Sequence, residues 1–185
     1  MLDSASAGGL GEQMAVSDMI PPAATPSFLA EAGWGGAQVS PLAGDASFRR
    51  YFRVVDGPRR AVLMDAPAPH EDPRPFIAIA DYLATNGFRP PRILAADLTQ
   101  GLVLIEDFGD RLMRAEIEAH PADEQAIYCQ AIDLLVALGK VPPAALPDYD
   151  LAVYLREVGL FTEWAMPALG LPVDQAGFDA AWSAA

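Results

Sequence analysis

Residues 41–55 read Pro-Leu-Ala-Gly-Asp-Ala-Ser-Phe-Arg-Arg-Tyr-Phe-Arg-Val-Val, a pattern typical of a strand, a tight turn and a second strand. The small or turn-forming residues 44–47 allow a sharp backbone bend and leave N–H groups free to face an anion. From residue 48 the pattern alternates, which predicts one buried and one polar face. The predicted buried face holds Phe48, Phe52 and Val54, and the polar face holds Arg49, Tyr51 and Arg53. Arginines directly after such a turn indicate a phosphate site, although an ordinary hairpin with solvated arginines has the same pattern.

Length and charge limit the class of protein. A chain of 185 residues can form one domain or two small lobes. Its formal net charge of −13 opposes binding to a nucleic-acid backbone, and no apolar run is long enough to span a membrane. The single cysteine, Cys129, falls in a helical pattern, where a buried thiol is expected. The N-terminus lacks the pattern of a signal peptide, so we expect a cytoplasmic protein.

Residues 1–25 are rich in Ala, Gly, Ser and Pro, which predicts a flexible leader. The pattern of residues 26–107 predicts a compact α+β lobe. Asp56-Gly57 is a hairpin signal, and we expect Pro58 and the two following arginines to extend that loop. Apolar spacing predicts a helix over 76–83, closed by Asn86-Gly87. The other predicted elements are a short helix at 26–33 and strands at 37–42, 48–55, 61–65, 92–96 and 102–105.

Residues 108–185 are helical in pattern. One helix carries an apolar stripe and ends near Gly139, a second begins at about Asp150 and ends near Pro167, and a third covers 173–182. The stripe consists of Ile127, Ala131, Leu134, Leu135 and Leu138.

Three motifs and the order of the elements resemble a known family. The motifs are 41–53, Val-Leu-Met-Asp-Ala-Pro at 62–67 and Leu-Ile-Glu-Asp-Phe-Gly-Asp at 104–110. They resemble the aminoglycoside-phosphotransferase-like family, which shares the protein-kinase-like fold. Within it, they are most similar to bacterial kinases that phosphorylate N-acetylmuramate or N-acetylglucosamine at C1 in cell-wall recycling. The resemblance implies a five-stranded small lobe with one helix, followed by a helical large lobe that begins near residue 108.

The resemblance also implies site residues and cofactors, namely ATP with Mg²⁺ and a small sugar substrate. The loop over the phosphates would be Gly44, Asp45, Ala46, Ser47 and Phe48, with Arg49 adding charge-assisted contacts. The hinge that meets the adenine edge would be Glu106, Asp107 and Phe108. Because Asp107-Phe108-Gly109 precedes any catalytic loop, it does not correspond to the metal-binding Asp-Phe-Gly of protein kinases. His70-Glu71-Asp72 begins like a catalytic loop but lacks its asparagine, so a solvated loop is expected there.

Two departures from the family pattern leave alternatives open. The third-strand lysine of kinase-like enzymes is replaced by Met64 or Asp65. The phosphates would then be held by backbone groups, by metal or by an arginine such as Arg49 or Arg50, or would not be held. No credible catalytic base or set of metal ligands lies within residues 1–185, so no catalytic or metal residue is assigned. We therefore expect an inactive N-terminal portion of a longer kinase whose incomplete large lobe self-associates. The alternatives are a non-catalytic nucleotide- or partner-binding module and a purely structural helical adaptor.

Overall fold

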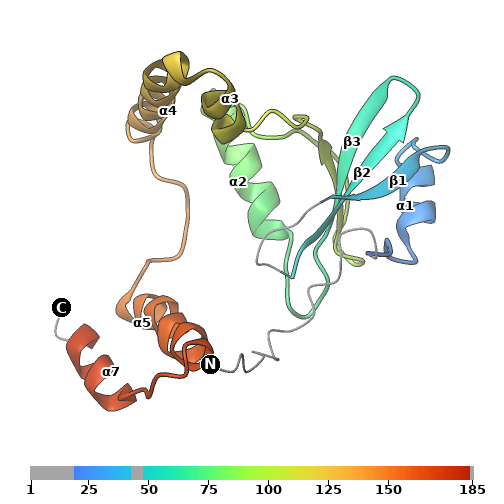
Figure 1. The fold of residues 1–185 in the computed structure, drawn as a ribbon. Coiled ribbons are helices and arrows are strands. Elements are labelled where there is room, and N and C mark those ends of the chain that lie inside the picture. The colour runs from blue at the N-terminus through green and yellow to red at the C-terminus, as the bar shows by residue number, and fades with distance from the viewer. Residues whose placement is uncertain (1–18, 43–47, 184–185) are drawn as a thin grey trace, which may run out of the picture. The chain divides into compact units, whose positions relative to one another are not determined.

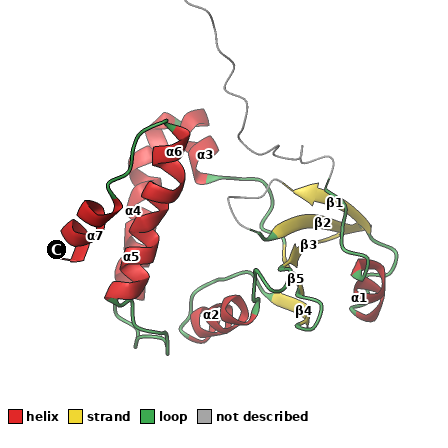
Figure 2. Cartoon of the chain, turned by 90° about the horizontal axis from the view of Figure 1, so that it is seen from below, coloured by secondary structure: helices red, strands yellow, loops and turns green. Residues whose placement is uncertain are grey.

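A computed structural model describes residues 19–42 and 48–183 of the chain. The chain divides into two units, Met1–Val141 and Pro142–Ala185, and each unit is described by itself (Figure 1). All the strands of the described residues lie in the first unit, and residues 108–183 are helix or loop (Figure 2).

The first unit is built around one antiparallel sheet of five strands in the order β1-β2-β3-β5-β4. The expected strands are confirmed with shifts of a few residues at their ends. Their bounds are β1 Gln38–Leu42, β2 Arg50–Asp56, β3 Arg59–Asp65, β4 Ile93–Asp97 and β5 Leu102–Glu106. Helix α1, Thr25–Glu31, precedes the sheet, and α2, Arg74–Thr85, connects β3 to β4. This is the α+β arrangement of a kinase-like small lobe, as the sequence predicted.

The hairpin between β2 and β3 is tighter than the sequence suggested. Asp56 pairs directly with Arg59, so the loop consists of Gly57 and Pro58 alone, and both arginines belong to β3. Gly57 adopts a φ of +57°, the left-handed conformation that a two-residue hairpin requires at its first position. The expectation of a loop extended through residue 60 was therefore wrong, because backbone pairing continues to the turn.

Each face of the sheet is covered by a different helix (Figure 1). Phe52, Leu63 and Leu104 share one face with α1 and Trp34. Met64, Val103 and Ile105 share the opposite face, against which Phe76 and Ile77 of α2 pack. Alternation along each strand therefore produces two apolar layers, one on each face of the central strands.

Helix α2 forms and ends as its sequence predicts. Its apolar spacing places Phe76 and Ala80 toward the sheet, while Asp81 is exposed. The Asn86 side chain donates a hydrogen bond to the Tyr82 carbonyl at 2.8 Å, and Gly87 follows with a φ of +83°. The helix therefore ends where the Asn-Gly pair interrupts it.

The remaining helices of the first unit are α3, Met113–Ala119, and α4, Glu124–Leu138, joined by a 3₁₀ turn at Pro121–Asp123. No residue of α4 is buried, and the expected stripe is exposed at Leu134, Leu135 and Leu138. Cys129 is exposed as well. The expectation of a buried thiol was wrong, because α4 buries none of its residues among those that the structure describes.

The second unit consists of helices held together by aromatic side chains. Helix α5, Leu151–Leu160, continues through a π-helical turn at Phe161–Ala165 to α6, Met166–Ala168, and α7 spans Gln175–Ser183. The Asp150 carboxylate caps α5 by accepting a hydrogen bond from the Val153 N–H at 2.9 Å. Trp182 contacts Tyr154 and Phe178 edge to face, at centroid distances of 5.4 and 6.1 Å. Among the described residues, no helix is both long enough and apolar enough to cross a membrane.

Candidate nucleotide-binding site

The predicted site residues fall at two places on the sheet of the first unit. Residues 44–47, the proposed phosphate loop, lie outside the described residues. Phe48 and Arg49 immediately precede β2, whereas Glu106 ends β5 and is followed by Asp107 and Phe108. The sheet therefore brings the two predicted groups into one lobe, on strands that are separated by β3.

Phe48 does not lie on the buried face of the sheet. Its side chain is 65% exposed, and its ring stacks on the imidazole of His70 with centroids 4.7 Å apart and planes inclined by 21°. The expectation that Phe48 is buried with Phe52 and Val54 was wrong, because β2 begins only at Arg50 and its alternation does not extend back to Phe48.

Arg49 forms an ion pair with the loop between β3 and α2. Its Nε lies 3.0 Å from Oε2 of Glu71, and both side chains are partly buried. Burial alone would lower the pKa of Arg49, but the hydrogen bonds and charges of Glu71 and Tyr51 together outweigh it and raise the pKa. Arg49 is therefore a fixed positive charge, and it lines a groove with Pro75 and Phe76 of α2.

His70 and Glu71 were read from the sequence as a solvated loop, and the structure corrects that reading in part. His70 and Asp72 are exposed as expected. However, His70 stacks on Phe48 and Glu71 pairs with Arg49, and these two partners directly precede β2. These contacts join positions 22 residues apart, so no local pattern predicts them. A short motif could have indicated only that the loop is polar.

The two candidates for the third-strand position face opposite sides of the sheet. Met64 is fully buried on the α2 side, beside Tyr51 and Val103. Asp65 faces the α1 side, where its Oδ2 accepts a hydrogen bond from Arg50 Nε at 2.7 Å. Arg50 also reaches the Ile20 carbonyl, which precedes α1. Arg50 is therefore turned away from the α2 side and neutralises a carboxylate that is only 2% exposed.

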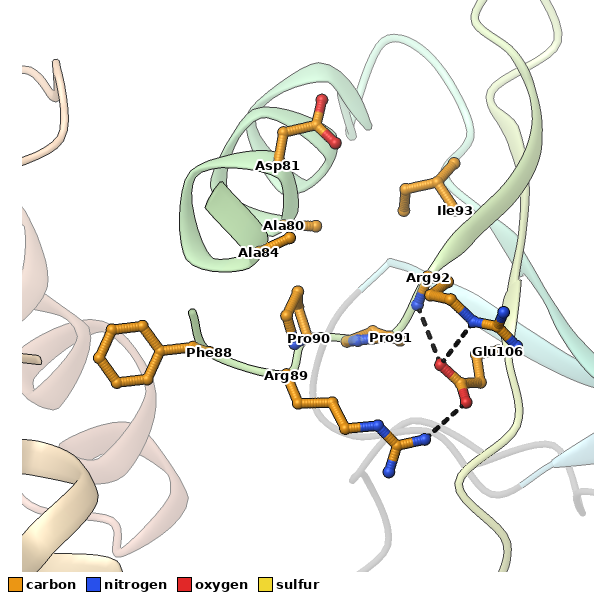
Figure 3. Close-up of a pocket in the computed structure, with 10 residues that line it drawn as sticks. All are labelled: Ala80, Asp81, Ala84, Phe88, Arg89, Pro90, Pro91, Arg92, Ile93 and Glu106. Atoms are coloured by element: carbon orange, nitrogen blue, oxygen red, sulfur yellow. Dashed lines mark hydrogen bonds and ion pairs between the residues drawn. The ribbon is translucent and has the colours of Figure 1, made fainter. Parts of the chain in front are cut away.

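At the end of β5, Glu106 is held by two arginines from the segment between α2 and β4 (Figure 3). Its Oε1 lies 2.8 Å from Arg89 Nη2, and its Oε2 lies 3.3 Å from Arg92 Nε. Burial favours a higher pKa for Glu106, but the N–H and guanidinium of Arg92 and the charge of Arg89 outweigh it and lower the pKa. The Glu106 N–H also donates to the Arg92 carbonyl at 2.9 Å, so this segment fixes both the backbone and the side chain.

Asp107 and Asp110 share a single arginine from β2. Arg53 Nη1 and Nη2 bind the two carboxylate oxygens of Asp110 at 2.9 and 2.7 Å. Its Nε lies 2.9 Å from Asp107 Oδ2 without the alignment of a hydrogen bond, whereas its Nη2 donates a hydrogen bond to Asp107 Oδ1 at 3.4 Å. The hydrogen bond from Arg53 lowers the pKa of Asp110, and that same bond raises the pKa of Arg53.

A pocket of about 620 Å³ lies beside Glu106, between the C-terminal half of α2 and the segment leading to β4 (Figure 3). Ala80, Phe88, Pro90 and Ile93 provide its apolar lining, and Asp81 and the arginines bound to Glu106 provide its charges. Neither Arg49 nor Met64 lines it. The pocket therefore lies away from the positions predicted to meet the phosphates.

Comparison of the chain with known proteins identifies its family. Residues 38–185 match the phosphotransferase enzyme family. The chain belongs to that family. It is 46% identical over 141 residues to an N-acetylmuramate/N-acetylglucosamine kinase of Pseudomonas aeruginosa, covering 74% of this chain and 41% of that protein. Proteins of the same name from Pseudomonas putida and Caulobacter vibrioides are 42% and 34% identical over 135 and 155 residues, which cover 71% and 69% of this chain.

The chain spans about two fifths of the length of these relatives, namely 41%, 39% and 42%. The phosphotransferase match begins at β1 and therefore includes both predicted parts of the site. Membership of the family confirms the resemblance drawn from the three sequence motifs. The contacts of Arg53, His70 and Glu71 are the part of the site region that sequence reasoning missed.

Proposed function

We propose that this chain is the nucleotide-binding part of an ATP-dependent kinase that phosphorylates a small hydroxylated substrate. The observation that carries the proposal is the family match over 38–185 on a lobe with the strand and helix order of a kinase. The names of the relatives support an amino sugar, N-acetylmuramate or N-acetylglucosamine, as the acceptor. Because such a kinase depends on cellular ATP, we also propose a cytoplasmic location.

Two parts of the site would bind different parts of ATP. Backbone N–H groups of residues 44–47 would surround the phosphates, and the charge of Arg49 at the α2 side supports a role in that contact. Backbone groups of residues 106–108 would meet the adenine edge. Phe48, which is exposed and stacks on His70, would be the last residue of this phosphate loop.

Magnesium would accompany the nucleotide. The three phosphates carry most of the negative charge, and Mg²⁺ prefers their oxygens together with a few carboxylates and waters. The described residues hold no group of three potential ligands for a metal ion. We therefore assign no metal ligand of this chain. The transfer itself would be an in-line displacement in which the acceptor oxygen bonds to the γ-phosphorus as the bond to ADP breaks.

A second candidate function is a nucleotide- or partner-binding module without catalysis. The observation that favours it is Met64, which occupies the α2 side of β3 where kinase-like enzymes carry a lysine for the phosphates. A thioether provides no charge for that contact.

Calorimetry with ATP and Mg²⁺ tests the proposal directly. Wild-type chain should bind, and Arg49→Ala should bind at least about fivefold more weakly, because a charge-assisted contact is lost. Arg156→Ala provides the control, since Arg156 forms an exposed ion pair with its neighbour Glu157 in the second unit.

Phosphorus NMR with N-acetylmuramate and N-acetylglucosamine then separates the two candidates when it is run on the complete gene product, because this chain spans about two fifths of the length of its relatives. Formation of a sugar phosphate by the complete gene product supports the kinase, and binding of ATP without transfer by it supports the non-catalytic module. Absence of ATP binding by folded chain contradicts both.

A further inference from the structure

Arg53 connects two parts of the lobe that the backbone does not connect. In the sheet, β3 lies between β2 and β5, so no ladder of hydrogen bonds joins β2 to the segment after β5. Arg53 pairs with Val62 of β3, which in turn pairs with Ile105 of β5. Two strand spacings amount to roughly 10 Å, and the arginine and aspartate side chains span this distance together. Its guanidinium reaches Asp107 and Asp110, beyond the end of β5.

The geometry of this contact is specific. Two parallel N–H···O bonds to Asp110 form the fork that fixes a guanidinium in both distance and plane. The Asp107 carboxylate is only 3% exposed, so the charge of Arg53 is its compensation. A lysine could not serve both carboxylates in this way, because it presents a single charged nitrogen.

Asp107 transmits the contact to the backbone. Its Oδ1 accepts a hydrogen bond from the Gly109 N–H at 2.7 Å, and Gly109 has a φ of +79°. The turn that includes Phe108 is therefore closed by the same carboxylate that Arg53 holds. Displacing Asp107 would release the turn and change the direction of the backbone groups at 107 and 108.

We propose that Arg53 is a positioning residue that fixes the Asp107–Gly109 backbone for the adenine edge and couples it to β2. This inference rests on the proposed nucleotide-binding function. It also assigns a role to the Asp107-Phe108-Gly109 sequence, in which the aspartate orders the hinge through Arg53.

Hydrogen exchange of backbone amides tests the positioning role without any nucleotide. Arg53→Met should raise the exchange rates of residues 107–110 about tenfold or more relative to those of β3 and β5. Arg53→Lys should fall between Arg53→Met and wild type, because the charge remains but the fork is lost. Unchanged exchange at 107–110 in Arg53→Met would overturn the inference, whatever the outcome of nucleotide binding.

Arg50→Met is the matched control. Arg50 is also on β2 and also pairs with an aspartate whose side chain is 3% exposed, but it lies on the opposite face of the sheet. Its replacement should reduce stability without selectively raising exchange at 107–110. Equal selective effects of the two substitutions would show that any lost ion pair on β2 loosens the hinge, and would overturn the specific role of Arg53.

Affinities for two probes test the role in recognition of adenine. Arg53→Met should weaken adenosine binding about tenfold while changing the affinity for tripolyphosphate less than about twofold. A loss confined to tripolyphosphate would overturn the assignment to the adenine side. Failure of wild-type chain to bind ATP, adenosine or tripolyphosphate would contradict the proposed function. The hydrogen-exchange rates would still show whether Arg53 orders residues 107–110.

Discussion

Arg49 Nε lies 3.0 Å from Glu71 Oε2, so the arginine nearest the proposed phosphate loop is already paired with a carboxylate. A guanidinium has five N–H donors and can bind a carboxylate and a phosphate together. The carboxylate nevertheless brings negative charge close to the place where phosphates would bind. Arg49 is therefore oriented by Glu71 and partly neutralised by it, and these two effects act on nucleotide affinity in opposite directions.

We predict that the neutralising effect dominates. Glu71→Gln keeps the shape and a hydrogen-bond acceptor but removes the charge, so ATP should bind roughly threefold to tenfold more tightly. Calorimetry measures this directly, with Glu157→Gln as a control because Glu157 belongs to an exposed pair in the second unit. Weaker binding in Glu71→Gln would show that orientation of Arg49 is the larger effect.

Glu106 gives the stability of the lobe a defined dependence on pH. Arg92 and Arg89 lower its folded-state pKa below the ordinary value, even though burial acts in the opposite direction. A carboxylate with a lowered folded-state pKa stabilises the protein above its unfolded-state pKa, and this contribution disappears as pH falls through the folded-state pKa. Wild-type chain should therefore be more stable than Glu106→Gln near pH 7, and the difference should shrink below about pH 4.

Urea unfolding of both proteins between about pH 3 and pH 7 measures that difference. Asp133→Asn, a substitution on the exposed helix α4, should show no comparable trend. A difference between wild type and Glu106→Gln that stays constant with pH would contradict the prediction.

Gly101 and Gly57 should differ sharply in their tolerance of alanine. Both have positive φ, +70° and +57°, so both substitutions incur backbone strain of about 1 kcal/mol. At Gly101 a Cβ would also overlap the Ala66 carbonyl, whereas at Gly57 no heavy atom lies within 4 Å. The Ala66 N–H donates to the Gly101 carbonyl at 2.9 Å, so the two backbones cannot separate without losing that bond.

Gly101→Ala should therefore lower the free energy of unfolding by about 2–4 kcal/mol, compared with about 1 kcal/mol for Gly57→Ala. Thermal or urea unfolding followed by circular dichroism provides the comparison. Equal losses would mean that the close approach of Gly101 to Ala66 relaxes freely.

Helix α4 should promote self-association of the chain. Leu134 and Leu135 are 61% and 67% exposed, and they lie near exposed Ile132 and Leu138 on a helix with no buried residue. Contiguous apolar surface of this kind favours association in water. Sedimentation velocity should show dimers or larger species whose fraction rises with concentration.

Leu135→Glu should shift that distribution toward monomer, because it places a charge in the apolar surface. Leu98→Glu is the control, since Leu98 is also exposed but lies in the turn between β4 and β5. A wild-type chain that remains monomeric at high concentration would contradict the prediction.

The division of the chain into a leader, a small lobe at 26–107 and a helical part at 108–185 stays a proposal. The boundary between the two compact units falls at a different position in the sequence, between Val141 and Pro142. The proposed roles of Gly44, Asp45, Ala46 and Ser47 also stay proposals, because these residues lie outside the described ranges.

The sequence by itself determined most of the elements and their order, although no pattern predicted α3. Alternation in β2, the Asp56-Gly57 signal, the stripe of α2 and the Asn86-Gly87 stop are local patterns, and local backbone preferences and side-chain periodicity are sufficient to read them. Residues 41–53 and 104–110 also carried the family resemblance, which the match over 38–185 confirmed.

Only the tertiary structure decided which charges meet. Arg49, Arg50 and Arg53 look alike in sequence, yet they pair with Glu71, Asp65 and Asp107 respectively, and Arg50 lies on the opposite side of the sheet from the other two. The pleat sends adjacent arginines to opposite faces, and strand pairing then brings a distant carboxylate to each of them. Such long-range pairings depend on the register and order of the strands, and no local pattern contains that information.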